Sequence, residues 1–400
     1  MTHDPFSRWD LTPVINASGT MTGIGAARVP KDIRRIVNGI LASFVNMDEL
    51  QSRAGAVIAR LTGAEAGCVT SCSAAAMVQT VAATLTGCNL ARIEALPAVT
   101  GARRVLLPAG HMVNYGAPVD QAIRLTGAEV IPIGTAAACE TWHLEAALEE
   151  GAAAAFYVVS HHTVRENEMP IDVFIALCRE HDVPVIVDMA SEYDLTGPIA
   201  HGASVAIYSG HKFLSGVTSG IVAGAAELIR ATYLQHFGIG RVMKAGKESV
   251  TGAMAALESW EERDHEAAGM EEDARVASWI TELAPIPGLT LSRHDDWTGN
   301  PIRRARIDID AGSAGFHAWE LADRLRRRSP SIVVRDDLVE RQEIYLDPCN
   351  LTDDEARDVS AAIHEEAARF RACGDGCRTS WSDIKRARAV SAVSWSGHAS

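Results

Sequence analysis

The chain has 400 residues, which is enough for a large domain with a full hydrophobic core and a smaller second domain. Its apolar content of 47% and charged content of 22% are ordinary for a globular protein, and its net charge of −14 argues against nucleic acid or an anionic membrane as the main partner. No run approaches roughly 18 apolar residues, and the N-terminus has no signal-peptide pattern.

Eight cysteines are scattered along the chain, and several lie in apolar or helical stretches, where a reduced, buried thiol is the expected state. Cys373 and Cys377 form a CxxxC pattern near the C-terminus. A zinc site would need two more clustered ligands, and the sequence offers none near this pair. We therefore expect reduced thiols, a cytoplasmic protein and no metal site.

Short apolar strands alternate with amphipathic helices through the first half of the chain. Strands are expected at residues 104–107, 129–133, 155–160, 183–188, 205–209 and 220–223, and helices at 74–85, 119–126, 143–150 and 173–181. This alternation predicts an α/β domain in which a parallel or mixed sheet carries helices on both faces. Such sheets bind ligands at the carboxyl ends of their strands.

A small α+β domain is expected in the second half of the chain, after a long helix over residues 249–283. Its expected elements are strands at 304–310, 332–335 and 343–346 and helices at 316–326 and 353–372. No periodicity persists beyond Cys373, so we expect a loose or partner-packed tail. The predicted organisation is an N-terminal segment packed on the core (1–45), a large domain (46–255), a linking helix with the small domain (256–372) and the tail (373–400).

Two of the expected strands lead to residues that together indicate one cofactor. The strand at 183–188, Val-Pro-Val-Ile-Val-Asp, is closed by the carboxylate of Asp188, and the segment Ile-Tyr-Ser-Gly-His-Lys runs into a turn that carries Lys212. Pyridoxal 5′-phosphate (PLP) needs a lysine that forms a Schiff base and a carboxylate that keeps its pyridine nitrogen protonated. Taken alone, Lys212 could be an ordinary turn lysine, and Asp188 could be a helix-cap or turn residue.

A phosphate site is expected where Thr-Ser-Cys-Ser-Ala-Ala-Ala-Met (residues 70–77) opens a helix. Backbone N–H groups and the helix dipole at Cys72, Ser73 and Ala74 would face an anion, although a plain serine N-cap fits the sequence equally well. Ser209, three residues before the lysine, could also bond the phosphate.

Other residues near the same sheet edge are candidates for contacts to the cofactor. His111 follows the strand at 104–107 and is expected to stack on the pyridine ring, unless it is a satisfied loop histidine. Ala190 is small enough to let the ring lie against the backbone, and His211 directly precedes the lysine. His161 and His162 lie at the same edge. One of them could reach the cofactor's 3′-oxygen, for which His161 is the candidate, or the substrate, for which His162 is the candidate, and the choice between them stays open.

Four cationic residues are candidates for an anionic substrate group. Arg241, Lys244 and Lys247 recur at spacings of three before the long helix, where they could also form a solvated basic turn. Arg335 ends the strand Ser-Ile-Val-Val-Arg and could form a forked contact with a substrate carboxylate, or an ion pair on the surface of the small domain.

The chain resembles the selenocysteine synthase-like group of fold-type I PLP enzymes, which includes bacterial seryl-tRNA selenium transferase and D-glucosaminate-6-phosphate ammonia-lyase-type proteins. The motifs that carry the resemblance are Val-Ile-Asn-Ala-Ser-Gly-Thr (14–20), Asn-Met-Asp-Glu-Leu-Gln (46–51), Leu-Thr-Gly-Ala-Glu-Ala (61–66), Val-Asp (187–188), Ser-Gly-His-Lys (209–212) and Lys-Ala-Gly-Lys-Glu (244–248). They span roughly residues 10 to 365. Together these motifs are specific for the group, but none of them is specific for one substrate.

The resemblance implies an aspartate aminotransferase-like fold and a homodimer or larger assembly. It also implies Lys212 as the Schiff-base lysine, Asp188 as the partner of the ring nitrogen, and a phosphate site at 72–74 and Ser209. The chain departs from the group at His211, where Gly or Asp is common, and at 216–218, where Gly-Pro-Gln is common. The group's N-terminal tRNA-binding domain does not precede the first motif, so tRNA is not the expected substrate.

The expected function is that of a PLP-dependent lyase. It would eliminate a β-substituent or ammonia from a small amino acid or amino sugar acid, with Lys212 taking the α-proton and the cofactor ring stabilising the carbanion as a quinonoid. Racemisation, aldol cleavage and transamination use the same lysine and carbanion and stay open as alternatives. A non-catalytic PLP-fold protein is a third possibility, and the intact Asp188 and Lys212 argue against it.

Overall fold

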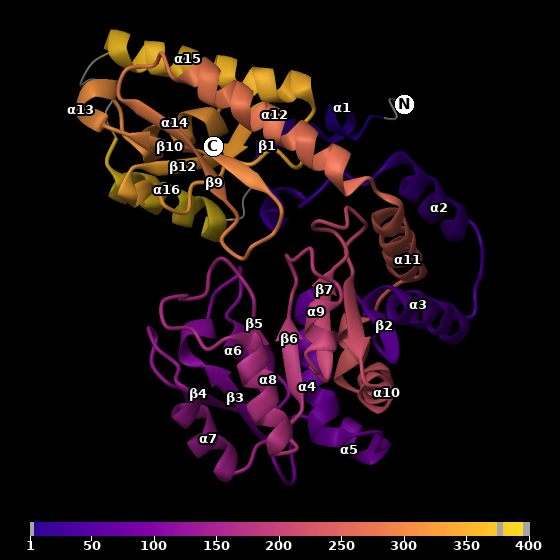
Figure 1. Ribbon diagram of the computed structural model, residues 1–400. Coiled ribbons are helices and arrows are strands. Elements are labelled where there is room, and N and C mark those ends of the chain that lie inside the picture. The colour runs from indigo at the N-terminus through magenta and orange to yellow at the C-terminus, as the bar shows by residue number, and fades with distance from the viewer. Residues whose placement is uncertain (1–3, 374–378, 395–400) are drawn as a thin grey trace. The chain divides into compact units, whose positions relative to one another are not determined.

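The computed structural model describes residues 4–373 and 379–394, which form two compact units. The large unit is Ala27–Arg263, and the small unit combines Met1–Ala26 with Asp264–Ser400 (Figure 1). Cys377, the second cysteine of the CxxxC pattern, lies outside the described residues. The four-part division that we expect from the sequence stays a prediction.

A seven-stranded mixed sheet forms the centre of the large unit, in the order β2-β8-β7-β6-β5-β3-β4. Paired strands from β4 through β7 run parallel, whereas β8 is antiparallel to both β7 and β2. The strands are β2 (Ala66–Thr70), β3 (Arg104–Pro108), β4 (Glu129–Ile133), β5 (Ala154–Val158), β6 (Val185–Asp188), β7 (Val205–Ser209) and β8 (Gly220–Gly224). All six strands expected from the sequence are present, and β2 is a seventh.

The helices of the large unit cover both faces of this sheet. They are α2 (Lys31–Leu41), α3 (Met47–Thr62), α4 (Ser73–Thr86), α5 (Leu90–Ala95), η2 (Ala109–His111), α6 (Val119–Arg124), α7 (Thr141–Glu149), α8 (Ile171–Glu180), α9 (Gly197–Ala200), α10 (Ala226–Leu234), η3 (Gln235–Phe237), η4 (Ile239–Met243) and α11 (Lys247–Glu262). Among the described helices of the protein, none has both the length and the apolar composition that crossing a membrane requires.

Two hydrophobic cores lie on opposite faces of the sheet, because successive side chains of a strand point to opposite sides. Ile186 and Ile207 belong to the core that α4, α6 and α10 cover. Their neighbours Val187 and Tyr208 belong to the core that α3, α7, α8 and α11 cover. Strands buried on both faces read as continuous apolar runs, which is the pattern that the sequence shows here.

The small unit is an α+β fold that includes the first strand of the chain. An antiparallel sheet has the order β12-β10-β9, and β1 pairs in parallel with β11, with Val14 opposite Ser331. The elements are α1 (Pro5–Trp9), β1 (Val14–Ala17), η1 (Thr22–Ile24), α12 (His265–Leu283), β9 (Leu289–Asp295), β10 (Arg303–Ile309), α13 (Ala311–Ala314), α14 (Ala318–Arg326), β11 (Ser331–Val334), η5 (Val339–Arg341), β12 (Glu343–Leu346), α15 (Asp353–Cys373) and α16 (Trp381–Ser394).

Two expectations about helices are corrected by the structure. The single helix expected over 249–283 is two helices, because the backbone of Arg263 is extended and the side chain of Asp264 caps the new helix by accepting the N–H of Ala267. The tail expected to be loose contains the helix α16. Trp381 at its start packs against the core of the small unit, which the weak periodicity of the segment did not indicate.

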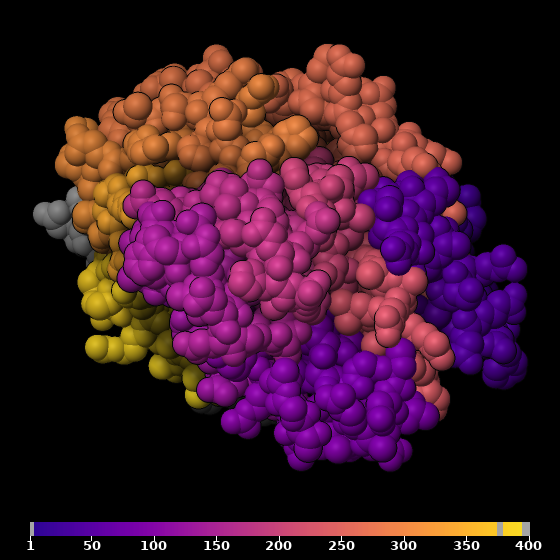
Figure 2. Space-filling model, turned by 60° about the horizontal axis from the view of Figure 1, so that its bottom comes forward, coloured from indigo at the N-terminus to yellow at the C-terminus, as the bar shows by residue number. Residues whose placement is uncertain are grey.

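Large apolar side chains are exposed on α2 and in the turn that follows it. Ile33 of this helix is buried, whereas Ile36, Leu41 and Phe44 are exposed. Figure 2 shows residues of this N-terminal part of the large unit, in indigo, projecting at one side of the molecule's surface. Contiguous exposed apolar groups commonly mark protein–protein contacts.

Replacing Trp279 with alanine is expected to lower the free energy of unfolding by about 3–5 kcal/mol, the usual effect of emptying a large aromatic site. Its side chain is 1% exposed, and its indole N–H donates to the carbonyl of Ala356 at 2.8 Å, so α12 and α15 both lose contacts. Urea unfolding followed by circular dichroism measures the change. The matched control is Trp142→Ala, since Trp142 is 62% exposed and should matter little. Equal stabilities of the two variants would contradict the prediction.

Candidate active site

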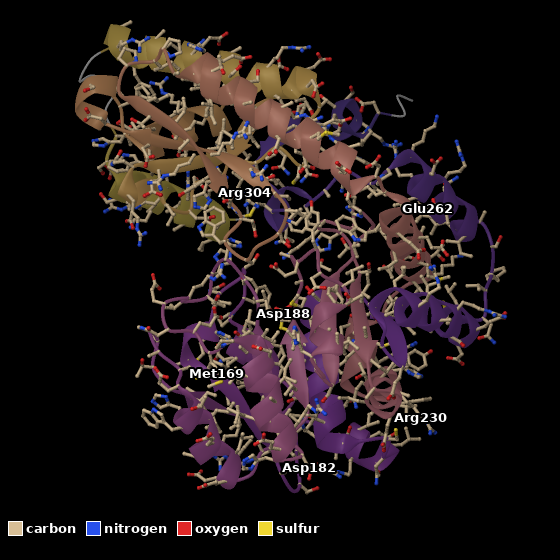
Figure 3. All side chains as sticks on the ribbon, in the orientation of Figure 1. Met169, Asp182, Asp188, Arg230, Glu262 and Arg304 are labelled. Carbon is tan, nitrogen blue, oxygen red and sulfur yellow. The ribbon has the colours of Figure 1, made fainter. Side chains whose placement is uncertain are left out.

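Asp188 and Ser209 close two neighbouring strands at the carboxyl edge of the large unit's sheet. Asp188 is the last residue of β6 and Ser209 the last of β7, and the two strands pair in parallel with Asp188 opposite Ile207. Figure 3 labels Asp188 at this end of the strands. Parallel strands bring their carboxyl ends to one edge, so the position predicted for both residues follows from the order of the elements.

The carboxylate of Asp188 is buried with little compensation. Its side chain is 6% exposed, and Oδ1 accepts the backbone N–H of Ala190 at 3.1 Å. Burial raises the pKa of Asp188 to about 6, and the nearby charge of Lys212 opposes part of that rise. A carboxylate held in this way is suited to face a cationic group, such as a protonated ring nitrogen.

Lys212 lies on a tightly closed loop between β7 and β8. Its Nζ donates to Oγ of Ser191 at 2.5 Å. The N–H of Gly210 donates to the carbonyl of Ser219 at 2.9 Å, and the N–H of Gly216 donates to the carbonyl of Gly210 at 2.7 Å. A Cβ atom at Gly210 would come within 2.1 Å of Oγ of Ser219, so any larger residue would force that side chain to move. The loop therefore presents the lysine amine in a fixed place beside Asp188.

The side chain of His211 is buried, and one of its two ring nitrogens makes no hydrogen bond within the described residues. Its Nδ1 lies 3.0 Å from Oγ of Ser209, and within the described residues no group hydrogen-bonds to its buried Nε2. Burial, followed by the charge of Lys212, lowers the pKa of His211, so the ring is neutral near pH 7. If the serine hydroxyl donates to Nδ1, Nε2 carries the proton and can donate to an anion.

The N-terminus of α4 offers further donors for an anion. Cys72 is the N-cap residue, and its Sγ accepts the N–H of Ala75 at 3.4 Å. The N–H groups of Ser73 and Ala74 lie in the first turn, where a helix has no carbonyl to offer them. A Cβ atom at Gly220 would meet the carbonyl of Cys72 at 2.3 Å, so β8 packs directly under this turn.

His111 ends η2 at the same edge of the sheet and is 2% exposed. Its Nδ1 accepts the N–H of Val158 at 3.2 Å, and its Nε2 lies 2.8 Å from Oε1 of Glu168. Both ring nitrogens are therefore occupied by the protein. This arrangement suits the stacking role expected for His111, since its nitrogens are not available to transfer a proton to the substrate.

The remaining candidates of the large unit have varied surroundings. The rings of His161 and His162 lie against each other, with centroids 3.8 Å apart. Arg241 and Lys244 are exposed. Lys247, by contrast, donates to the carbonyls of Leu41 and Ser43 after α2, so its ammonium already has acceptors within the chain.

Arg335 belongs to the small unit and is buried there. Its guanidinium lies over the ring of Trp297, with Cζ 4.9 Å from the ring centroid, and its Nε is 3.5 Å from Oδ2 of Asp337. Burial and the neighbouring charge of Arg304 lower the pKa of Arg335. An arginine held by an aromatic platform has a fixed fork, which suits recognition of a carboxylate.

Three residues of the site were not anticipated from the sequence. Ser191 accepts the hydrogen bond of Lys212, and Glu168 bonds to His111. Burial, together with the charges of Asp188 and Cys72, raises the pKa of Tyr115 to about 12. Tyr115 follows β3 at the carboxyl edge, a position that could have marked it as a candidate.

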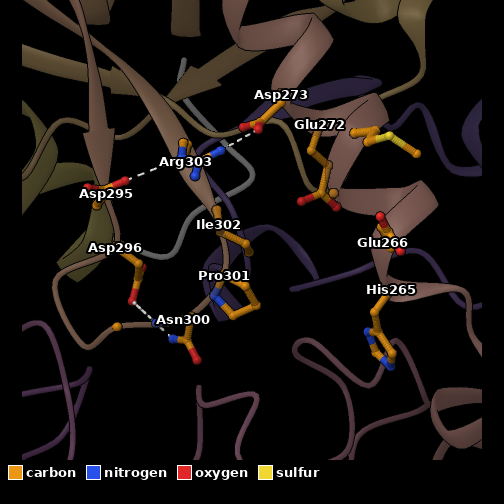
Figure 4. Close-up of a pocket in the computed structure, with 13 residues that line it drawn as sticks. His265, Glu266, Glu272, Asp273, Asp295, Asp296, Asn300, Pro301, Ile302 and Arg303 are labelled. Carbon is orange, nitrogen blue, oxygen red and sulfur yellow. Dashed lines mark hydrogen bonds and ion pairs between the residues drawn. The ribbon is translucent and has the colours of Figure 1, made fainter.

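A separate acidic pocket of about 430 Å³ lies within the small unit, between the start of α12 and the segment that joins β9 to β10 (Figure 4). Arg303 pairs with Asp273 and with Asp295 on its wall, and Asn300 donates to Asp296 at 3.0 Å. Among the described residues, no cluster has the ligand grouping that a metal ion needs.

The residues at the sheet edge fit PLP. The buried Nε2 of His211 lacks an acceptor among the described residues, and the first turn of α4 supplies N–H donors, so an anion such as the cofactor phosphate is accommodated. The buried carboxylate of Asp188 is suited to a pyridinium nitrogen, and the amine of Lys212 lies close enough for its charge to act on that carboxylate.

Comparison with known proteins agrees with this chemistry. The family model described as L-seryl-tRNA selenium transferase (SelA) matches residues 14–272. The chain belongs to this family. It is 34% identical over 368 residues to a D-glucosaminate-6-phosphate ammonia lyase of Salmonella typhimurium, covering 92% of this chain and 99% of that protein. It is 33% identical over 358 residues to a 5′-C-glycyluridine monooxygenase-decarboxylase of a Streptomyces species, covering 89% and 90%.

Solved structures confirm the fold expected for this SelA-family chain. A structure of D-glucosaminate-6-phosphate ammonia-lyase superposes with a TM-score of 0.83 at 33% identity, covering 93% of this chain and all of that one. The ureidoglycine–glyoxylate aminotransferase of Bacillus subtilis, at 13% identity and a TM-score of 0.60, covers 90% and 94% and shares the fold alone. The fold is that of fold-type I PLP-dependent enzymes, as the sequence predicts.

Proposed function

We propose that the protein is a PLP-dependent lyase that removes ammonia from an amino sugar acid or a related small amino acid. The observation that carries the proposal is the placement of Lys212, whose amine bonds to Ser191, near the buried carboxylate of Asp188 at the carboxyl edge of the sheet. The name of the 34% identical relative, which spans nearly the whole chain, supports ammonia release as the outcome.

Each part of the site has a task in this reaction. Bound PLP supplies an electron sink for the α-carbon of an attached amino acid. Asp188 keeps a proton on the pyridine nitrogen, His111 lies against the ring, and the first turn of α4 with Ser209 and His211 holds the phosphate. Ala190, directly after the β6 turn, leaves room for the ring. Tight loop closure at Gly210 keeps the lysine amine within reach of the substrate.

Lys212 moves the protons of the reaction. With a substrate bound, the free amine of Lys212 would take the α-proton, and the hydroxyl of Ser191 would orient that amine. The Cβ–O bond then breaks, and the ammonium returns its proton to the departing hydroxide, which leaves as water. The enamine would be released when the amine of Lys212 takes its place on the cofactor. It would then tautomerise to an imine, which one water would hydrolyse to a keto acid and ammonia, so the net loss is ammonia alone.

Cationic and polar residues would bind the anionic parts of the substrate. Arg335 is proposed for the carboxylate, and the exposed Arg241 and Lys244 for a distal anionic group such as a sugar phosphate. His161 and His162 are proposed for the cofactor's 3′-oxygen and a substrate hydroxyl. Lys247 is the weakest of these candidates, because two backbone carbonyls already accept from its ammonium.

The test incubates the PLP-loaded protein with D-glucosaminate 6-phosphate, its dephosphorylated form, and a panel of D- and L-β-hydroxy amino acids. We expect equimolar ammonia and keto acid from at least one sugar acid, measured by a coupled dehydrogenase assay and by semicarbazone absorbance. Exchange of the α-hydrogen in D₂O without either product would favour racemisation. A PLP-loaded protein that yields no keto acid from any member of the panel would contradict the lyase proposal.

A second candidate is oxidative decarboxylation, because the 33% identical relative is named a monooxygenase-decarboxylase and covers nearly as much of the chain. That reaction starts from the same displaced amine of Lys212 and consumes molecular oxygen. An oxygen electrode and trapped carbon dioxide distinguish the two: uptake of oxygen with a glycyl nucleoside, and no ammonia from sugar acids, would favour this candidate.

We propose that the chain works as a homodimer or larger homo-oligomer, without nucleic acid or a membrane as partner. The exposed Ile36, Leu41 and Phe44 supply an apolar surface for a second copy, and the net charge of −14 disfavours nucleic acid. Six cysteines of the described residues carry free thiols, whereas Cys373 is disulfide-bonded. The free thiols favour a cytoplasmic protein, which we also propose. Sedimentation as a single chain at micromolar concentration would contradict the assembly.

A further inference from the structure

His111 is held by a segment far away in the chain. The loop from 159 to 170, which follows β5, passes over the turn that carries His111 and brings Glu168 to it. Oε1 of Glu168 lies 2.8 Å from Nε2 of the ring, and the side chain of Glu168 is partly buried. Nothing in the reaction as described above uses this carboxylate.

The hydrogen bonds decide which nitrogen of His111 carries the proton. The donor at Nδ1 is the backbone N–H of Val158, which cannot accept, so Nδ1 must present its lone pair. The ring proton therefore sits on Nε2, where it is donated to the carboxylate of Glu168. Together the two contacts define the tautomer and the plane of a neutral imidazole.

The loop that carries Glu168 is itself fixed relative to His111. The N–H of Val164 donates to the carbonyl of Gly110 at 3.2 Å, and a Cβ atom at Gly110 would lie 3.5 Å from the carbonyl of Val164. Asn167 adopts a left-handed φ of 56°, and its carbonyl accepts the N–H of Cys139 at 3.3 Å. These contacts aim the next residue, Glu168, at the ring.

Tyr157 braces the same pair from the sheet. Its ring meets that of His111 edge to face, with centroids 4.4 Å apart and planes at 89°. Its hydroxyl donates to the carbonyl of Met169 at 2.7 Å, which ties the ring to the residue after Glu168. The imidazole is thus constrained at both nitrogens and by an aromatic neighbour.

We propose that Glu168 is a positioning residue that holds His111 as the neutral Nε2–H imidazole in the plane needed for stacking on the cofactor ring. The proposal rests on the proposed function, since that function supplies the cofactor. A fixed, uncharged ring can lie against a pyridinium, whereas an imidazolium in the same place would repel it. Glu168 itself touches neither cofactor nor substrate in this account.

The experiment compares Glu168→Ala and Glu168→Gln with Glu166→Ala, a matched control that removes an exposed glutamate from the same loop. The first readout is the ¹⁵N spectrum of the histidines in the cofactor-free protein, with His111→Asn used to assign the signal. The second is the dissociation constant of PLP, measured by titration. The third is kcat on the substrate found above.

In the wild type we expect separate Nδ1 and Nε2 resonances for a neutral Nε2–H ring. Glu168→Ala should shift the Nε2 resonance, because that N–H loses its carboxylate acceptor while Val158 still donates to Nδ1. It should also weaken PLP binding roughly 10-fold and lower kcat by a similar factor, as expected for loss of a hydrogen bond to a charged group. Glu168→Gln keeps an acceptor for Nε2–H and should restore both within about 3-fold. Glu166→Ala should match the wild type throughout.

The proposal is overturned if Glu168→Ala keeps the wild-type ¹⁵N pattern and PLP affinity, or if Glu168→Gln is as impaired as Glu168→Ala. Its failure is distinguishable from that of the proposed function. A wild-type protein that binds no PLP removes the function and the inference together, whereas a PLP-binding lyase whose Glu168→Ala variant behaves like Glu166→Ala removes the inference only. Circular dichroism identifies any variant that fails to fold.

Discussion

Replacing Lys212 with alanine is expected to lower kcat by roughly 10⁴-fold or more, because one side chain supplies both the covalent attachment and the base. In the proposed reaction the amine of Lys212 takes the α-proton and returns a proton to the leaving hydroxide. With the amine removed, water would have to do both in a buried site. The measurement is ammonia release under single-turnover conditions, together with the absorbance of bound PLP before and after borohydride.

Lys31→Ala is the matched control, since Lys31 is an exposed lysine at the start of α2 that has no part in the site. It should retain the activity and the reducible PLP absorbance of the wild type. The loop that carries Lys212 is closed by a backbone hydrogen bond between Gly210 and Ser219, which does not involve the lysine side chain. Both variants should therefore keep the same fold. A Lys212→Ala variant that turns over at a tenth of the wild-type rate would refute the assignment of this lysine.

Replacing Asp188 with asparagine is expected to stabilise the cofactor-free protein while it impairs the enzyme. The folded-state pKa of Asp188, about 6, lies above its unfolded value. At neutral pH the folded protein therefore contains a buried carboxylate charge that lowers its free energy of unfolding. Removing that charge should raise the free energy of unfolding by about 2–3 kcal/mol above pH 7, at 1.36 kcal/mol for each pKa unit. Loss of the charge opposite a protonated pyridine should lower kcat/KM by roughly 10²-fold.

The raised pKa of Asp188 also fixes how the free energy of unfolding changes with pH. Because the folded state binds the proton more tightly, the contribution of Asp188 to stability falls as pH rises from about 4 to about 6 and is constant above that range. The stability difference between Asp188→Asn and the wild type should therefore be small at pH 4 and reach its full size by pH 7. Urea unfolding of the cofactor-free proteins at several pH values measures this difference. A difference that shrinks with rising pH would contradict the assignment of the burial energy to Asp188.

Much of the large unit could be predicted because its strands carry a strong local signal. Asp188 and Ser209 end apolar, β-branched runs, and parallel strands necessarily bring such ends together. The break at Asp264 was missed because helix formers continue on both sides of it, and only the N-cap geometry reveals the new start. Likewise, α16 has an irregular apolar pattern, and its first residue is held by packing against the small unit.

The site could be predicted only where one residue type carries the chemistry by itself. Lys212 and Asp188 are recognisable in that sense, whereas Glu168 is meaningful only through His111, which lies far from it in the sequence. Ser191 is similar, because its role depends on how the loop after β6 meets the loop after β7. Contacts between loops are set by tertiary packing, which no local pattern encodes.

The parallel pairing of β1 with β11 bears on how the chain is made. β1 is synthesised well before its neighbour β11, because more than 300 residues separate Val14 from its partner Ser331. At about 5–20 residues per second the interval is roughly 15 to 60 seconds, during which the large unit can fold but β1 has an unpaired edge. β1 thus has no partner strand until β11 is made, so a bulky fusion placed before β1 would hinder the last step of folding and not the first.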